Sequence, residues 1–128
     1  MKVAGIGFRA TATLADLRAA LALVGTQPDA LASVTDRADM PALKQLAKEM
    51  QLPLLALAET DIAGEQTLTC SPRIKARFAT GSLAEACALV AARKGTPGMA
   101  PARSRLIAPR SVTADGLATA AIAERLEP

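Results

Sequence analysis

The sequence predicts an α/β fold: one three-layer domain over residues 1–128, with helices on both faces of a largely parallel sheet of four to five strands. In the first half of the chain, short apolar runs alternate three times with segments of helical period. A length of 128 residues suits one hydrophobic core. Because 51% of the residues are hydrophobic but only 2% are aromatic, that core must consist of Ala, Leu, Val and Ile.

Three strands and two helices are expected in the first half of the chain. Thr13 starts the first helix, because Asp16 three residues later completes a capping box, and Gly25 ends it. Pro41 occupies the first turn of the second helix. The third predicted strand is apolar throughout, which is typical of a strand covered on both faces. The predicted strands are Val3–Phe8, Leu31–Thr35 and Leu54–Leu57.

The second half of the chain is less regular. Ser71, which precedes a proline, starts a short basic helix, and Ser82 starts a longer one in which Glu85 takes the capping-box position. The stretch 95–104 holds two glycines and two prolines and is expected to be a loop. Two elements follow: a strand over Arg105–Ala108, and the tail Ala118–Leu126, which fits a helix by its alanine content or an edge strand by its alternation.

Positive charge is concentrated in the second half of the chain. The formal net charge is +3, but residues 66–114 hold eight basic residues and one acid, a balance of +7. Such a distribution implies an anionic partner. No nucleic-acid partner is expected, because the chain lacks the Tyr and Trp residues that stack on bases and carries no nucleic-acid motif. A small molecule with several carboxylates or phosphates fits the charge at least as well.

The composition also narrows the possible chemistry. No apolar run approaches the roughly 18 residues that span a membrane, and the N-terminus lacks a signal-peptide core. We therefore expect a soluble, cytoplasmic protein without a membrane partner. Histidine, the commonest metal ligand and general base, is absent, and Cys70 and Cys87 are not at metal-ligand spacing. We expect no metal and no cofactor.

The stretch GIGFRA near the N-terminus allows three interpretations. Gly5 and Gly7 with Ala10 satisfy the relaxed dinucleotide fingerprint, and Asp36 follows the second strand, where such proteins place an acid on the ribose. Alternatively, the glycines only permit a tight turn. The third interpretation is a loop that presents backbone N–H groups and Arg9 to an anionic ligand.

Several other polar side chains have both a structural and a functional interpretation. Ser71 is either a helix N-cap or a hydroxyl that binds a carboxylate. Glu85 is either a capping-box residue or, as the one acid in the basic window, a catalytic general base that acts on water. Arg105 and Arg110 flank the fourth strand and, together with Arg9, would ring one crevice if the sheet brings these ends together.

The order of these motifs resembles the small cobalamin-biosynthesis family that includes CobE and the C-terminal domain of CbiG. The resemblance covers nearly the whole chain and depends on the ordered set rather than on any single motif. Phe8, Arg37 and Arg110 stand where the family has a cysteine and two lysines, so the positive charge is kept but amine chemistry is not. The matching runs are Gly5–Arg9, Ser33–Asp39, Leu43 with Leu46–Ala47, Ser71, Thr80–Leu89, Arg105–Ile107 and Thr119–Ala123.

The resemblance implies a ligand and a set of contacts. A corrin precursor is a large macrocycle that carries many carboxylates, so the arginines of the set would pair with carboxylates. The glycines and the serine would supply close backbone and hydroxyl contacts, and the tail would be a closing strand. The predicted ligand-binding residues are Gly5, Gly7, Arg9, Asp36, Arg37, Ser71, Arg105 and Arg110.

Three functions are open, and the first is preferred. The resemblance implies a cobalamin (vitamin B12) biosynthesis protein of the oxygen-dependent corrin route. It would bind a polycarboxylate tetrapyrrole, a precorrin or hydrogenobyrinic acid, as an accessory or carrier protein that works with other enzymes of the route. The second is an enzyme with lactone-hydrolysis-like chemistry in which Glu85 positions or activates water. The resemblance suggests it because full-length relatives open a lactone on a cobalt-precorrin and release a two-carbon aldehyde. The third is a dinucleotide-binding module.

Overall fold

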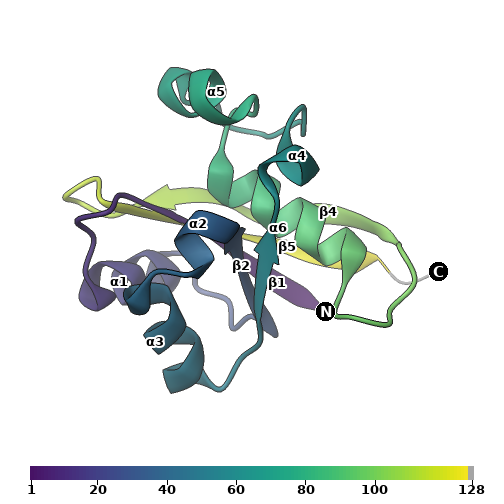
Figure 1. Ribbon diagram of the computed structural model, residues 1–128, viewed down its shortest axis with the longest axis horizontal. Helices are drawn as coiled ribbons and strands as arrows, with labels where there is room; N and C mark the ends of the chain where they lie inside the picture. Colours follow the sequence, from purple (N-terminus) through teal and green to yellow (C-terminus); the bar gives the residue numbers. More distant parts are fainter. Residues whose placement is uncertain (127–128) are drawn as a thin grey trace.

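The computed structural model describes residues 1–126, and Figure 1 shows how their elements are arranged. A five-stranded sheet in the order β3-β2-β1-β5-β4 forms the centre of the structure. The strands are β1 (Lys2–Phe8), β2 (Ala30–Val34), β3 (Leu54–Leu57), β4 (Arg103–Val112) and β5 (Ala118–Leu126). The helices are α1 (Leu14–Leu23), α2 (Thr35–Ala38), α3 (Pro41–Met50), α4 (Glu59–Ile62), α5 (Pro72–Phe78) and α6 (Leu83–Lys94).

The sheet is mixed, so the prediction of a largely parallel sheet is wrong, whereas the α/β class is confirmed. β1 pairs in parallel with β2, and β2 pairs in parallel with β3. β5 pairs antiparallel with both β1 and β4. The pairing of Lys2 with Glu124 joins the two ends of the chain. Local periodicity cannot reveal such a long-range pairing, because it reports only which residues face the core.

The tail forms a strand in the middle of the sheet and not at its edge. β5 lies between β1 and β4, and its residues from Ala120 to Ala123 are completely buried. The edge strand next to β5 is β4, which is longer than the predicted Arg105–Ala108. It contains Pro109, which has no N–H to donate and is therefore tolerated on an edge strand.

Two apolar clusters on the two faces of the sheet give the three layers that the sequence predicts. On one face, α6 packs against strand residues that include Val3 and Val34. On the other face, α1 and α3 pack against residues that include Ile6 and Leu31. The side chains of both clusters are mostly Ala, Leu, Val and Ile, as the composition requires. No helix among residues 1–126 has the length and hydropathy needed to cross a membrane.

Local signals in the sequence explain most helix boundaries. Thr13 and Asp16 form the predicted capping box of α1. Ser71 caps α5 and Ser82 caps α6, each with its hydroxyl oxygen accepting a backbone N–H three residues on. The one-turn helices α2 and α4 were not predicted, because four residues are too few to show a helical period.

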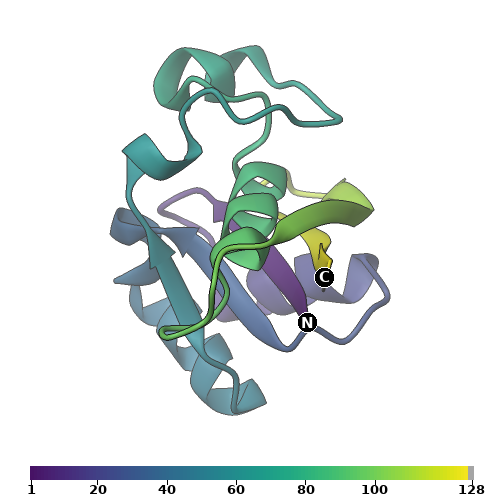
Figure 2. The same cartoon turned by 90° about the vertical axis from the view of Figure 1, so that its right-hand side faces the viewer.

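The segment that carries α4 and α5 stands away from the sheet, at the top of both views (Figures 1 and 2). α5 buries none of its residues completely. Ion pairs fasten the segment internally and to the end of α6. These pairs are Glu59 with Arg77 (2.7 Å), Asp61 with Lys94 (3.0 Å) and Glu65 with Arg93.

Candidate functional site

The sheet topology brings several segments together at one edge. The parallel strands β1 and β2 end at this edge, β5 begins there, and β4 ends there. A cavity of about 250 Å³ opens at the edge, with α5 as its opposite wall. We call it the arginine pocket. Its lining residues are Gly7, Phe8, Arg9, Arg37, Ser71, Arg73, Ile74, Phe78, Leu83, Arg110, Val112, Gly116, Leu117 and Thr119.

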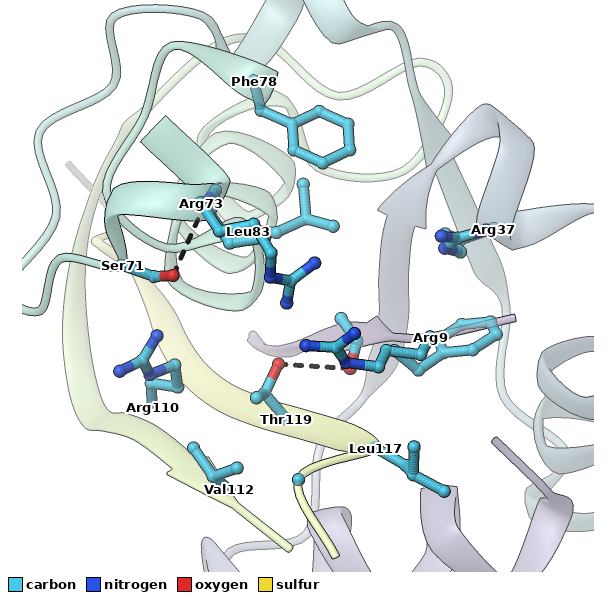
Figure 3. A pocket seen from close by; sticks show the side chains of 14 residues that line it. Arg9, Arg37, Ser71, Arg73, Phe78, Leu83, Arg110, Val112, Leu117 and Thr119 are labelled. Atoms are coloured by element: carbon cyan, nitrogen blue, oxygen red, sulfur yellow. Dashed lines mark hydrogen bonds between the residues drawn. The ribbon is translucent and has the colours of Figure 1, made fainter. Parts of the chain in front are cut away.

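Four arginines from four different segments line the pocket. Arg9 follows β1, Arg37 lies on α2, Arg73 on α5 and Arg110 on β4. In Figure 3, the guanidinium groups of Arg9 and Arg73 lie between α5 and β5. Arg110 lies next to Ser71, and Arg37 lies on the other side of the pocket. Within residues 1–126, none of the four forms an ion pair with a carboxylate, and no acid lines the pocket. Such a cluster of cations is suited to an anion.

Neighbouring groups orient two of these arginines without neutralising their charge. The guanidinium carbon of Arg37 lies 5.7 Å from the centre of the Phe8 ring, and its Nη1 lies 3.6 Å from the sulfur of Met40. A cation–π contact of this kind leaves the guanidinium N–H groups available to an anion. The backbone N–H of Arg9 donates to the carbonyl of Leu117 at 2.9 Å, which ties the loop after β1 to the β4–β5 hairpin.

Arg110 reaches the pocket through an irregularity in β4. Residues 108–111 of β4 run alongside only residues 120–122 of β5, so β4 carries one extra residue there. Such a β-bulge frees a backbone group from the ladder and re-aims a side chain. The freed N–H of Arg110 donates to the carboxylate of Glu85 at 2.8 Å. The Nε of Arg110 is buried and has no acceptor in the described part of the chain.

The remaining lining is partly apolar. Thr119 donates its hydroxyl to the carbonyl of Gly7 at 3.1 Å, and a Cβ at position 7 would lie 2.8 Å from that hydroxyl oxygen. Glycine at this position therefore permits the close contact between β1 and β5. Phe78 and Leu83 add apolar surface beside the arginines (Figure 3), and Ile74 also belongs to the lining. The pocket can hold a ligand that combines anionic groups with an apolar body.

α5 contributes both a predicted and an unpredicted residue. Ser71 lines the pocket, and its oxygen accepts the N–H of Ile74 at 3.5 Å, so its hydroxyl hydrogen is available to an acceptor. Arg73 was not in the predicted set. It occupies the first turn of α5, where the helix dipole disfavours a cation. That position is the one signal in the sequence that could have singled out Arg73 from the other basic residues.

Three residues of the predicted ligand-binding set lie outside the lining of the pocket. A Cβ at Gly5 would lie 1.9 Å from the carbonyl oxygen of Ala84, so Gly5 allows α6 to pack directly on β1. Asp36 is exposed on α2. Arg105 lies near the other end of β4, where its Nη2 is 3.2 Å from Glu124. The predicted crevice therefore includes Arg110 and Arg9 but not Arg105.

Glu85, the predicted general base, is completely buried and does not line the pocket. Its carboxylate accepts the N–H groups of Leu68 (2.7 Å), Thr69 (3.0 Å) and Arg110 (2.8 Å), and the hydroxyl of Thr69 (3.0 Å). The predicted capping box is only half formed, because the oxygen of Ser82 accepts the N–H of Glu85 but the carboxylate is used elsewhere. Both carboxylate oxygens are thus engaged by protein donors.

Acids from outside the basic window neutralise part of it. Four of the eight basic residues of the window form ion pairs, and the pocket takes two of the others. The pairs are Arg77 with Glu59, Arg93 with Glu65, Lys94 with Asp61, and Arg105 with Glu124; the two in the pocket are Arg73 and Arg110. Ion pairs with described acids therefore account for half of the basic residues of the window, and two of the other four line the arginine pocket.

The described residues offer no metal centre. Among them, no group of three or more His, Cys, Asp or Glu side chains could hold a metal ion. Cys70 is exposed and Cys87 is buried, and neither is in a disulfide. Burial raises the pKa of the Cys87 thiol to about 12, so this thiol stays protonated and unreactive at neutral pH.

Comparison with known proteins confirms the family resemblance. The family model described as "Cobalamin synthesis G C-terminus" matches residues 2–123. The crystal structure of CobE, a protein from the cobalamin (vitamin B12) biosynthetic pathway, has a TM-score of 0.80 at 30% identity, covering 99% of this chain and 91% of that chain. The crystal structure of cobalamin biosynthesis protein chiG from Agrobacterium tumefaciens has a TM-score of 0.67 at 32% identity, covering 99% of this chain and 100% of that chain. No protein with a curated description matches the sequence. The chain therefore belongs to the CobE/CbiG family of cobalamin biosynthesis proteins.

Proposed function

We propose that this protein binds an acidic precorrin or corrin intermediate of the oxygen-dependent route to cobalamin, as an accessory or carrier protein. The observation that carries the proposal is the convergence of Arg9, Arg37, Arg73 and Arg110 in one pocket without a carboxylate partner among residues 1–126. Corrin precursors carry several carboxylates on the rim of the macrocycle. The guanidinium fork matches a carboxylate in geometry and binds it with two parallel hydrogen bonds.

The size of the pocket determines how such a ligand would sit. Pockets that enclose drug-sized ligands measure roughly 300–1,000 Å³. The arginine pocket, at about 250 Å³, is smaller than a tetrapyrrole macrocycle needs. One edge of the ligand, with the carboxylates it bears, would enter the pocket and contact Ile74, Phe78 and Leu83 with its apolar part. The rest would remain outside the pocket.

A partly exposed ligand suits a carrier. An enzyme of the same route could reach the protruding part of the macrocycle while the arginines still hold the other edge. We therefore propose other cobalamin-biosynthesis enzymes as protein partners. The thiols of Cys70 and Cys87 are both free, which fits a reducing compartment such as the cytoplasm.

The geometry supports binding better than the two alternatives. A hydrolase needs a base that reaches water in the site, and the carboxylate of Glu85 is instead buried among four protein donors. A dinucleotide needs free N–H groups at the helix that follows β1. At that helix, the side chains of Thr13 and Asp16 occupy the cap, and α6 covers Gly5.

An absorbance titration with hydrogenobyrinic acid tests the proposal. We expect a shifted corrin spectrum, saturation at one site, and an affinity that falls as the salt concentration rises, because the pairing charges are partly exposed. The same mixture is then monitored for turnover, which would move the assignment to an enzyme. No spectral change with hydrogenobyrinic acid or with earlier precorrins would contradict the proposed function.

A further inference from the structure

The carboxylate of Glu85 does not cap α6; it accepts hydrogen bonds from other segments of the chain. The oxygen of Ser82 already accepts the N–H of Glu85, so α6 is capped without the acid. The carboxylate is nevertheless fully buried, and no cation forms an ion pair with it in the described part of the chain. A buried charge is unfavourable unless hydrogen bonds compensate it, and here four donors do so. Those donors come from two separate parts of the chain.

The two carboxylate oxygens are each anchored to a different segment. Oε1 accepts the backbone N–H groups of Leu68 and Thr69, at 2.7 and 3.0 Å. These residues lie three and two positions before Ser71, the cap of α5, and α5 carries one wall of the arginine pocket. Oε2 accepts the N–H of Arg110, at 2.8 Å, together with the hydroxyl of Thr69. Arg110 belongs to the opposite wall.

Side chains of α5 also form an ion pair with α4 and pack partly against the apolar cluster around α6. None of the residues of α5 is completely buried, and α5 stands away from the sheet in Figures 1 and 2. The N–H of Ser71 donates to the carbonyl of Gly81 at 2.7 Å, which joins the start of α5 to the segment that leads into α6. The bulge in β4 likewise leaves the N–H of Arg110 outside the β ladder. Both walls therefore form hydrogen bonds with the same buried carboxylate.

We propose that Glu85 is the positioning residue of the arginine pocket: it sets the distance between Arg110 on one wall and Ser71 with Arg73 on the other. This inference rests on the proposed function, in which the pocket holds carboxylates of a corrin precursor. Glu85 does not touch the ligand and takes no part in chemistry. It acts through the backbone of the residues that do bind.

The replacement Glu85→Gln tests this role, because an amide has one acceptor oxygen where the carboxylate has two. In either orientation, the NH₂ group of glutamine faces N–H donors of one wall, so one of the two anchors is lost. We expect this variant to bind hydrogenobyrinic acid at least tenfold more weakly than the wild type. Ser82→Ala is the matched control. It removes the cap from the same helix and lowers the melting temperature, and it leaves the affinity unchanged.

Equal affinity of Glu85→Gln and wild type would overturn the inference and leave the proposed function standing. If Glu85→Gln does not fold, Thr69→Val takes its place, because it deletes only the hydroxyl bond to Oε2. For that variant we expect a loss of affinity of about threefold, on the scale of one partly exposed hydrogen bond. Unchanged affinity in Thr69→Val would likewise overturn the inference.

A second readout works without any ligand and separates this inference from the proposed function. Cys70 lies between Thr69 and Ser71 and is exposed, whereas Cys87 is buried, so a trifluoroethyl label at neutral pH reports on Cys70. We expect one narrow ¹⁹F resonance in the wild type and in Ser82→Ala, and a broadened or split one in Glu85→Gln. If the wild type fails to bind hydrogenobyrinic acid, the proposed function fails and this spectrum decides the role of Glu85. An unchanged resonance in Glu85→Gln would refute it.

Discussion

Arg110 donates its backbone N–H to the carboxylate of Glu85 over 2.8 Å while its side chain lines the arginine pocket. Glu85 thus contacts the backbone of a pocket residue, but its carboxylate forms no ion pair with the guanidinium group of Arg110. The charge of Glu85 is compensated by N–H and O–H donors, and the guanidinium groups of the pocket keep their capacity to pair with an external carboxylate. One acid can therefore organise a basic site without occupying it.

Removal of any one pocket arginine should weaken the binding of hydrogenobyrinic acid. For Arg9→Ala, Arg37→Ala, Arg73→Ala or Arg110→Ala, we expect a loss of about 1.5–3 kcal/mol, roughly tenfold to a hundredfold in Kd, because each removes a charge-assisted hydrogen bond. Absorbance titrations at one salt concentration give the comparison. Arg105→Ala is the matched control, since Arg105 pairs with Glu124 outside the pocket. Wild-type affinity in all four pocket variants would contradict the assignment of the site.

The sequence predicts well those features that depend on neighbouring residues. Thr13, Ser71 and Ser82 cap helices as predicted, because a cap is encoded within four residues. The place of β5 in the middle of the sheet was not predictable, since it depends on pairing between residues more than 100 positions apart, such as Lys2 and Glu124. The buried alanines of β5 fit either a helix or a strand until their neighbours are known.

The candidate site was predicted in part for a similar reason. Arg9 and Arg37 follow the ends of parallel strands, which meet at one edge, so their proximity follows from the predicted topology. The predicted topology does not show whether Arg105 and Arg73 line the pocket. Only the structure shows that Glu124 pairs with Arg105, whereas no carboxylate of the described residues pairs with Arg73.

Gly5→Ala should destabilise the protein strongly without a direct effect on the pocket. The new methyl group would lie 1.9 Å from the backbone oxygen of Ala84, so α6 would have to move away from β1. We expect a loss of at least about 3 kcal/mol in the free energy of unfolding, on the scale of overpacked cores. Urea denaturation measures this loss. Gly64→Ala is the control: its φ of +80° makes alanine strained, at about 1 kcal/mol, but no atom of residues 1–126 lies within 4 Å of the added Cβ.

A small stability loss in Gly5→Ala, equal to that in Gly64→Ala, would show that α6 can shift at little cost. The ligand-binding interpretation of Gly5 would then deserve a direct test by titration. The prediction that Gly5→Ala is the less stable of the two variants follows from the atoms around each glycine. The glycine fingerprint in the sequence gives no basis for this ranking.

Arg125 is a structural residue that the sequence analysis missed. It is 6% exposed on β5, and its Nη1 donates to the carbonyls of Ala92 (3.3 Å) and Arg93 (2.9 Å), near the end of α6. Its Nη2 donates to the carbonyl of Ala100. Arg125→Met keeps much of the apolar stem but leaves these carbonyls without their charged donor. We expect a loss of about 3 kcal/mol in the free energy of unfolding, because hydrogen bonds to charged groups are the strong ones.

Arg103→Met provides the comparison for Arg125→Met. Arg103 is exposed on β4, so its replacement should change the free energy of unfolding by no more than about 0.5 kcal/mol. Thermal or urea unfolding of both variants gives the measurement. Equal stability of the two variants would show that the carbonyls at the end of α6 find other donors, and the capping role of Arg125 would be withdrawn.

Acid should release the α4–α5 segment before it unfolds the sheet. The hydrogen bond from Arg77 lowers the pKa of Glu59 below its ordinary value of 4.5, and the hydrogen bond from Lys94 lowers the pKa of Asp61 below 3.8. A carboxyl with a lowered pKa in the folded state stabilises that state above its ordinary pKa and stops doing so as the pH falls. The two apolar clusters that cover the sheet contain no carboxyl group. We therefore expect amide exchange, corrected for its intrinsic pH dependence, to accelerate in residues 59–80 between about pH 5 and pH 3 while β1 and β5 stay protected.

Lys94→Ala, which removes the partner of Asp61, should show part of this acceleration already at neutral pH, and it should weaken the pH response of the segment. Simultaneous loss of protection in the segment and in the sheet would mean that the ion pairs do not hold α4 and α5 as a separate unit.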